Sequence, residues 1–361
     1  MNPLQIPRAC LPLLGVLSLQ AFVVGSSWPS QVSPPVTAWH DPSPHQVHFV
    51  DVDSTTRLEV LDWGGTGETI VLLAGLGNTA HVFDDFAQRL TDRFRVIGIT
   101  RRGNGASSRP GHGYDVSTLT DDIRHVLDAL NLRQVHLVGH SIAGDEITTF
   151  AVRYPQRLSK AVYLDAAYDH VNFAPDWPAP PKATAEDLSS PAAFRSYRAR
   201  IIALQPEAEI RATVEFDAEG RAIKNSTPPE VWSAIQQSVT HPAYPSIQAA
   251  ALAIYAVPVK PTDMARSYEE WSPSDKARLD RLLQTQLIWA AEQRRRFAAD
   301  VRRGIVVEIQ GATHFLFISN EVEVLKAMRS FLLESRASGG GAQSRDAMST
   351  PLIPGENRTD R

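Results

Sequence analysis

Cysteine is almost absent from this sequence: Cys10 is the only one among 361 residues. One cysteine cannot form an intramolecular disulfide, and it lies in an N-terminal segment that we expect to be removed. The remaining chain would have no cysteine at all. We therefore expect no disulfide framework, no thiolate nucleophile and no zinc site built from cysteines.

Basic charge and phosphate-binding loops are also scarce. The formal net charge is -4, and the short run "QRRRF" falls within a stretch of helical pattern. This balance gives nucleic-acid binding no electrostatic support. The glycine-rich stretches "GGTGE" and "GNGASS" lack the Lys-Ser/Thr of a phosphate loop and the three glycines of a dinucleotide fingerprint. We interpret them as turns and expect no cofactor.

Long apolar runs are limited to the N-terminus. The run "CLPLLGVLSLQAFVV" covers 15 residues, fewer than the ~20 of a spanning helix, and small polar residues follow it. Residues 1–27 thus resemble a secretory signal peptide, with an uncleaved anchor as the alternative. We expect an exported protein that touches a membrane only if this segment is retained. We expect residues 28–47 to form a Pro-rich arm and residues 336–361 to form a disordered tail.

Between these ends, residues 48–335 alternate between strand and helix patterns. The segments "VHFVDVD" and "RLEVLDW" predict a pair of strands, and the runs "TIVLLAGLG", "FRVIGIT", "QVHLVGH", "KAVYLDA" and "GIVVEIQ" predict further strands. The segment "LTDDIRHVLDALNL" predicts an amphipathic helix that opens with a Thr-Asp cap. Strands that are apolar throughout and alternate with helices predict an α/β fold, with a mostly parallel central sheet flanked by helices.

The alternation breaks at about residues 170–247, which are proline-rich with scattered helical pieces. We interpret this stretch as a helical cap insertion above the sheet. Its aromatic residues are expected either to line a substrate pocket or to form the core of the insertion; they are Phe173, Trp177, Phe194, Tyr197 and Trp232.

The segment "VHLVGHSIAGDE" places Ser141 between a strand and a helix. A sharp turn between two such elements holds its apical side chain clear of the sheet, beside free N–H groups of the helix. A serine hydroxyl needs a base to become a nucleophile, and the base needs a partner that orients it. His314 in "GATHF" is the candidate base. Asp165 and Asp263, which both follow strands, are the candidate acids.

Four segments in this order resemble the α/β-hydrolase superfamily over roughly residues 48 to 335: "IVLLAGLG", "ITRRGNGASSRP", "LVGHSIAG" and "GATHF". The resemblance is to the serine-nucleophile branch, because Ser141 occupies the position at which other branches carry a carboxylate. The chain departs from the family at Ala74, where His is usual, and at Ala143, where Gly is usual. It also carries Thr100 where relatives usually have Asp, so we expect no catalytic role for Thr100.

The resemblance implies that the backbone amides of Leu76 and Ile142 form an oxyanion hole. Most family members carry the acid after the seventh strand, which favours Asp263. Lipases of the pancreatic type carry it after the sixth strand, in a Leu-Asp-Pro-Ala stretch to which "LDAA" is similar. We prefer Asp165, with Asp263 as the alternative and Asp169 or Glu269 behind them.

We expect neither a catalytic nor a metal-binding role for four further histidines. His140 is expected to pack in the turn. His40, His45 and His48 are closely spaced but lie in the Pro-rich arm without carboxylates in a matching pattern, so we expect no metal.

Two functional hypotheses follow. The first is an exported serine hydrolase that cleaves a small-molecule ester, or else an amide, through an acyl-enzyme. The second is a ligand-binding protein on the same fold with little or no turnover. Peptidase, lactonase or carbon–carbon hydrolase activity stays open, because the insertion that shapes the pocket cannot be folded by inspection.

Overall fold

The computed structural model describes residues 39–172 and 177–334. The expected signal peptide with Cys10, most of the Pro-rich arm, Phe173 and the expected tail lie outside these residues. Among the described residues, no helix combines the length and the apolar character needed to cross a membrane.

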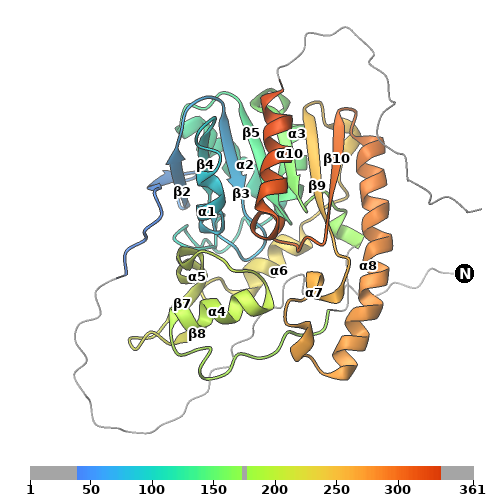
Figure 1. Ribbon diagram of the computed structural model, residues 1–361. Coiled ribbons are helices and arrows are strands. Elements are labelled where there is room, and N and C mark those ends of the chain that lie inside the picture. Colours follow the sequence, from blue (N-terminus) through green and yellow to red (C-terminus); the bar gives the residue numbers. More distant parts are fainter. Residues whose placement is uncertain (1–38, 173–176, 335–361) are drawn as a thin grey trace, which may run out of the picture.

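An eight-stranded sheet forms the centre of the molecule, in the order β1-β2-β4-β3-β5-β6-β9-β10 (Figure 1). The strands are β1 Gln46–Asp51, β2 Arg57–Gly64, β3 Thr69–Leu73, β4 Arg95–Ile99, β5 Val135–His140, β6 Leu158–Leu164, β9 Ala250–Val257 and β10 Gly304–Gln310. β1 pairs antiparallel with β2, and β2 with β4, whereas the other neighbours are parallel. The mostly parallel α/β architecture predicted from the sequence is therefore confirmed.

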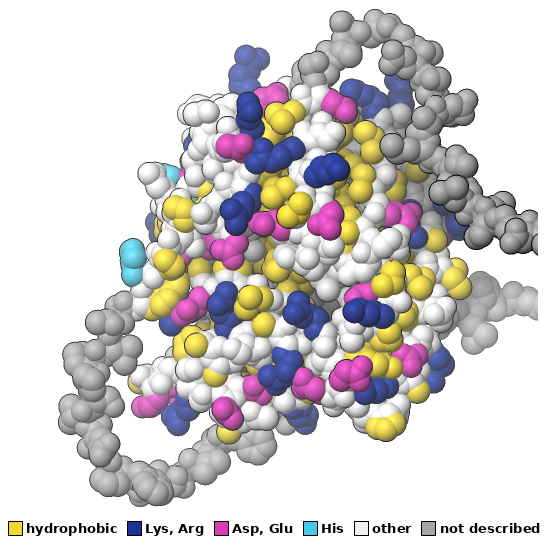
Figure 2. Space-filling model, viewed as in Figure 1, with side chains coloured by type: hydrophobic (Ala, Val, Ile, Leu, Met, Phe, Trp, Pro, Cys, Tyr) yellow, Lys and Arg dark blue, Asp and Glu magenta, His cyan; other side chains and the backbone are white. Residues whose placement is uncertain are grey.

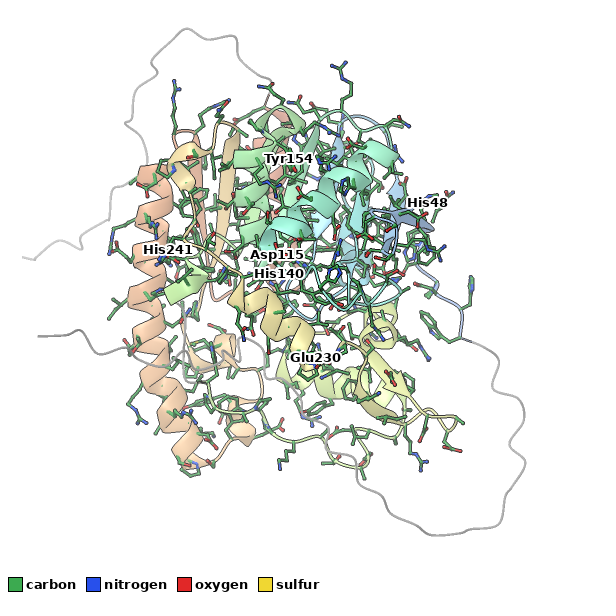
Figure 3. All side chains as sticks on the ribbon, turned by 180° about the vertical axis from the view of Figure 1, so that it is seen from behind. His48, Asp115, His140, Tyr154, Glu230 and His241 are labelled. Atoms are coloured by element: carbon green, nitrogen blue, oxygen red, sulfur yellow. The ribbon has the colours of Figure 1, made fainter. Side chains whose placement is uncertain are left out.

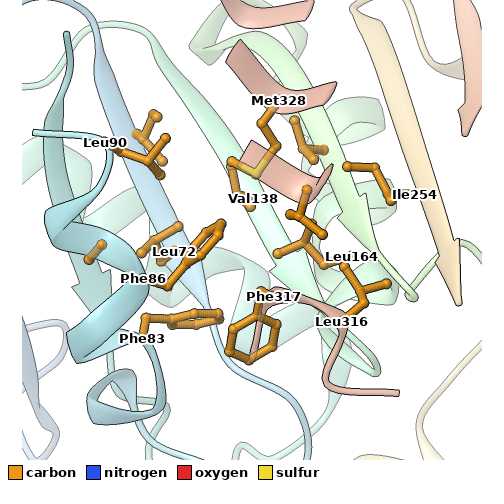
Figure 4. Packing of buried hydrophobic residues seen from close by; sticks show 14 of the residues in the cluster. Leu72, Phe83, Phe86, Leu90, Val138, Leu164, Ile254, Leu316, Phe317 and Met328 are labelled. Atoms are coloured by element: carbon orange, nitrogen blue, oxygen red, sulfur yellow. The ribbon is translucent and has the colours of Figure 1, made fainter. Parts of the chain in front are cut away.

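Helices cover both faces of the sheet because its strands are apolar on both faces. These helices are α1 Asp84–Gln88, α2 Val116–Ala129, α3 Ala143–Arg153, α8 Pro273–Asp300, α9 Leu316–Ser319 and α10 Glu321–Leu333. Ile70 and Leu72 of β3 join a core with α1 and α10, while Val71 and Leu73 join a second core with α2, α3 and α8. Figure 4 shows part of the first core, in which Phe83, Phe86 and Phe317 meet.

The start of α2 differs from the prediction. The helix begins at Val116, and its N-cap is Asp115, whose carboxylate accepts a hydrogen bond from the amide of Thr118. Thr120, expected at the cap, lies inside the helix, where its hydroxyl donates to the carbonyl of Val116. Asp115 caps the earlier turn because its short carboxylate reaches the free amides there.

The chain between β6 and β9 forms a layer beside one end of the sheet. It contains α4 Pro191–Ile201, α5 Glu207–Thr213, β7 Val214–Phe216, β8 Ala222–Asn225 and α6 Pro229–Gln237. α7 Pro261–Met264 and one end of the long helix α8 lie beside this layer, and α8 extends along the sheet as well (Figure 1). The strands β7 and β8 pair antiparallel. The insertion therefore contains a small sheet as well as helices, whereas the sequence had predicted helices alone.

The topology determines where a site can form. From β3 the chain proceeds to β4 on one side, then crosses back to β5 on the other side of β3. At such a reversal, the loops that leave the carboxyl ends of neighbouring strands diverge and leave a crevice. Ser141 directly follows β5 and Leu76 closely follows β3, so both residues lie at this reversal.

Candidate active site

Ser141 stands at a strained turn between β5 and α3. Its φ is 56°, a left-handed conformation that few residues other than glycine adopt. Such strain in a non-glycine residue is typical of functional sites. The turn is tight because Gly144 packs against the end of β6: a methyl group on Gly144 would lie 1.9 Å from the carbonyl oxygen of Ala166. Ser141 is therefore held at the apex, as the sequence predicted.

His314 lies in the loop between β10 and α9 and meets Asp165, which follows β6. The imidazole Nδ1 of His314 donates to Oδ2 of Asp165 over 2.7 Å. The other carboxylate oxygen, Oδ1, accepts from the amide of Ala256 at 3.1 Å and from the hydroxyl of Tyr168 at 2.5 Å. Asp165 is 6% exposed. Three donors thus fix this carboxylate and, through it, the orientation of the imidazole.

The carboxylates of the other three candidate acids form hydrogen bonds or ion pairs with groups other than His314. Oδ2 of Asp263 accepts the amides of Val259 and Lys260 at the start of α7. Asp169 pairs with His241 and Arg296, and Glu269 pairs with Lys276. Of the four acids, Asp165 alone hydrogen bonds His314 in the part of the chain that the structure describes.

Nε2 of His314 is buried and has no hydrogen-bond partner among the described residues. His140 lies beside it, with ring centroids 4.5 Å apart, and its Nε2–H donates to the backbone carbonyl of His314 at 2.9 Å. Burial and the neighbouring His314 hold the pKa of His140 well below its usual range. His140 is therefore neutral and supports the loop that carries His314.

The loop after β3 approaches Ser141 closely. A methyl group on Gly75 would lie 3.2 Å from Cβ of Ser141 and 2.8 Å from Nδ1 of His140. Within the described residues, the amides of Leu76 and Ile142 donate no hydrogen bond to another protein group. An oxyanion hole requires such free amides close to the nucleophile, and the amide of Ile142 belongs to the residue directly after Ser141.

Arg101, to which no role was assigned from the sequence, holds this loop in place. Its guanidinium donates to the carbonyl of Ala74 at 2.7 Å and to Oε1 of Glu146 in α3 at 2.7 Å. Arg101 thus connects the loop after β3 to the helix that follows Ser141. The only signal in the sequence was an arginine directly after a strand. Its neighbour Thr100 is buried and donates to Glu59, away from the site.

A cavity of about 160 Å³ opens beside His314 and Asp165. Aromatic side chains line much of it, among them Tyr168, Trp177, Trp271 and Trp289. Of the aromatic residues weighed from the sequence, Trp177 lines this cavity, while Phe194 and Tyr197 form the core of the insertion. Trp232 of α6 instead packs over Gly77, in the loop after β3.

The closely spaced histidines separate in the structure. His40 and His48 are exposed, and Figure 3 places His48 at the sheet edge, away from His140. The side chain of His45 is 3% exposed and contacts His81 and Asp84. The sequence had grouped His45 only with His40 and His48. On the face seen in Figure 2, basic and acidic side chains are interspersed over the described residues.

The family described as alpha/beta hydrolase fold matches residues 68–321, so the chain belongs to the α/β-hydrolase family. Among curated relatives, it is 33% identical over 101 residues to a 2-(acetamidomethylene)succinate hydrolase of Mesorhizobium japonicum. It is 36% identical over 110 residues to a putative carbamate hydrolase, RutD, of Caulobacter segnis. These alignments cover 28% and 30% of this chain, and only 36% and 41% of the relatives.

Solved structures share the fold over a longer range. The crystal structure of E-2-(acetamidomethylene)succinate hydrolase has a TM-score of 0.56 at 22% identity, covering 80% of this chain and 99% of that one. A bacterial membrane phospholipase A has a TM-score of 0.55 at 20% identity, covering 82% and 88%. At these identities, the likeness shows the fold.

Proposed function

We propose that this chain is a serine hydrolase that cleaves a small-molecule ester through a covalent acyl-enzyme. The observation that carries the proposal is the hydrogen bond between His314 and Asp165 at the same edge of the sheet as the strained Ser141. The hydrolase names of the partial relatives agree with bond hydrolysis. Amides are the second substrate class.

In the proposed reaction, Oγ of Ser141 attacks the carbonyl carbon, and its proton moves to Nε2 of His314. Asp165 keeps the other imidazole proton on Nδ1, so that Nε2 is the basic nitrogen, and stabilises the imidazolium. The amides of Leu76 and Ile142 stabilise the oxyanion. His314 then protonates the leaving alcohol, and a water molecule activated by the same imidazole releases the acid and regenerates Ser141.

Export is a separate proposal, which rests on residues 1–27 alone. The pattern of charge, apolar run and small residues there supports a secretory leader.

Labelling with a fluorescent fluorophosphonate tests the nucleophile. We expect wild type and the control Ser196→Ala to be labelled, because Ser196 is exposed on α4, whereas Ser141→Ala is not labelled. Hydrolysis of a series of p-nitrophenyl esters should fall at least about 10³-fold in Ser141→Ala. Absence of label and turnover in the folded wild type would reject the proposal in favour of a ligand-binding protein.

A further inference from the structure

A cluster of buried and partly buried histidine and carboxylate side chains lies apart from Ser141, His314 and Asp165. Asp41 and His45 come from the segment that leads into β1, while His81 lies in the 3-10 helix η1 Ala80–Phe83 and Asp84 begins α1. One donor atom from each of these four residues lies within 4.8 Å of all the others. The side chains of His45 and Asp84 are 3% and 1% exposed.

The spacing of the donor atoms suits a single small cation. Asp84 lies 2.9 Å from Nδ1 of His45 and 3.1 Å from Nδ1 of His81, through its two oxygens. Oδ2 of Asp41 lies 3.5 Å from Nδ1 of His81 and 3.6 Å from Nε2 of His45. Bonds of 2.0–2.2 Å to a tetrahedral ion place its ligands about 3.3–3.6 Å apart. Small side-chain movements would therefore bring all four donors to one ion.

Negative charge exceeds positive charge in the cluster. Glu59 of β2 adds a third carboxylate, with Oε1 3.6 Å from Nε2 of His81. Arg109 and Arg211 line the adjoining cleft, but Arg211 pairs with Glu207 and stacks on Trp39, and Arg109 donates to the carbonyl of Gly105. The three carboxylates carry three negative charges. Without a metal, Asp84 and Glu59 raise the pKa of His81 to about 10, so a cation must displace that proton; a divalent ion bound to the neutral imidazoles would then largely neutralise the carboxylates.

Neighbouring groups hold the carboxylates in place, as they do around bound metals. The indole N–H of Trp63 donates to Asp84 at 3.1 Å, and the amide of Ser43 donates to Asp41 at 2.9 Å. An entry path also exists. Asp41 and His81 line a solvent-open cleft of about 640 Å³ between the sheet domain and the insertion.

We propose that Asp41, His45, His81 and Asp84 bind one divalent transition-metal ion, with Zn²⁺ as the best match. Two imidazoles with two carboxylates suit Zn²⁺, whereas Ca²⁺ and Mg²⁺ prefer oxygen ligands alone. The ion joins the segment before β1 to η1 and α1, so its role is structural. It binds independently of ester hydrolysis.

The test uses the full chain without a histidine tag, after treatment with a chelator. Equilibrium dialysis against Zn²⁺ should find one tightly bound ion per chain, and Co²⁺ should produce the visible absorption bands of a tetrahedral site. Zn²⁺ should also raise the thermal unfolding midpoint. His45→Ala and His81→Ala should each weaken Zn²⁺ binding at least about 100-fold, because each removes a ligand.

His48→Ala is the matched control, since His48 is an exposed histidine on the neighbouring strand. His314→Ala is a second control that excludes Zn²⁺ binding at the proposed catalytic residues. Both variants should bind Zn²⁺ as wild type does. If His81→Ala does not fold, His45→Ala decides, with folding checked by circular dichroism. The proposal is overturned if wild type binds no stoichiometric ion, or if binding survives in folded His45→Ala or is lost in His314→Ala.

Discussion

At the scale of single residues, the hydrogen bond from His314 to Asp165 agrees with the sequence-based preference for Asp165 over the alternative acid Asp263. We expect Asp165→Asn to lower kcat for an ester about 10³–10⁴-fold, because the amide no longer holds the Nδ1–H tautomer. Asp263→Asn should change kcat less than about 10-fold, because the asparagine oxygen still accepts the amides at the start of α7. Steady-state kinetics on the two variants makes the comparison. Equal losses would refute the choice of Asp165.

Gly144 illustrates how a single methyl group can control the turn that carries Ser141. In Gly144→Ala, the new methyl would collide with the backbone oxygen of Ala166, so β6 and α3 would have to separate. We expect the free energy of unfolding to fall by about 1–3 kcal/mol or more, as for an overpacked core. Urea denaturation measures this loss.

Gly111→Ala is the control for Gly144→Ala, since nothing lies within 4 Å of a methyl group there. Its free energy of unfolding should stay within about 0.5 kcal/mol of wild type. A Gly144→Ala variant as stable as Gly111→Ala would mean that the turn is looser than the structure shows.

At the scale of elements, Arg101 couples the loop after β3 to α3. In Arg101→Lys, one ammonium group cannot replace the guanidinium fork that reaches both Ala74 and Glu146. We expect kcat to fall about 10–100-fold with little change in KM, because a displaced Leu76 amide weakens oxyanion stabilisation more than substrate binding. Steady-state ester kinetics separates the two constants.

Arg102→Lys provides the comparison for Arg101→Lys. Arg102 is also buried but pairs with Asp122 and Asp53, away from the loop after β3. We expect the Arg102→Lys variant to be less stable than wild type but not to show the selective loss of kcat expected for Arg101→Lys. If both variants lowered kcat equally, Arg101 would have only a structural role.

The elements that the sequence predicted best are those in which one residue after another is buried, so that the segment is apolar throughout. The continuous apolar runs of β3, β5 and β6 are recognisable because both faces of the sheet are covered. The hairpin β7–β8 went unseen because its strands have three and four residues and little buried surface. The capping error at α2 has another origin: Asp115 and Thr120 are both residue types favoured at N-caps, so residue type alone does not choose between them.

The sequence could predict those candidate site residues whose position follows from the order of strands and helices along the chain. Ser141 and His314 each follow a strand that the sequence pattern predicts, whereas the choice of Asp165 depends on which carboxylate side chain turns toward His314. The link from Arg101 to Glu146 and the meeting of His45 with His81 depend on tertiary packing. Neither pair has a regular spacing that a single sequence could reveal.

At the scale of the whole molecule, Glu209 joins the insertion to the sheet domain. This residue of α5 is fully buried, and its carboxylate accepts from Nδ2 of Asn78 at 2.7 Å and from the amide of Thr79 at 3.2 Å. Burial raises the pKa of Glu209 to about 7, although the bonds from Thr79 and Asn78 oppose the shift. Asn78 lies two residues after Leu76, so this contact also holds the loop after β3.

The raised pKa predicts a loss of stability as the pH rises. Below the ordinary value of 4.5, the folded and unfolded chains both carry the proton and the shift has no effect. Between 4.5 and about 7, the unfolded chain releases the proton while the folded chain keeps it, so folding becomes less favourable. Above about 7 the penalty is complete, at about 3 kcal/mol for a shift of this size.

Glu209→Gln removes this titration and should remove its share of the pH dependence. We expect the stability of wild type relative to the variant to fall by about 2–3 kcal/mol between pH 5 and pH 8, whatever constant difference the amide introduces. Urea denaturation across this range measures it. Glu207→Gln, on the same helix but partly exposed, should follow wild type in slope. A pH-independent difference between Glu209→Gln and wild type would show that the carboxylate is already ionised when the insertion docks.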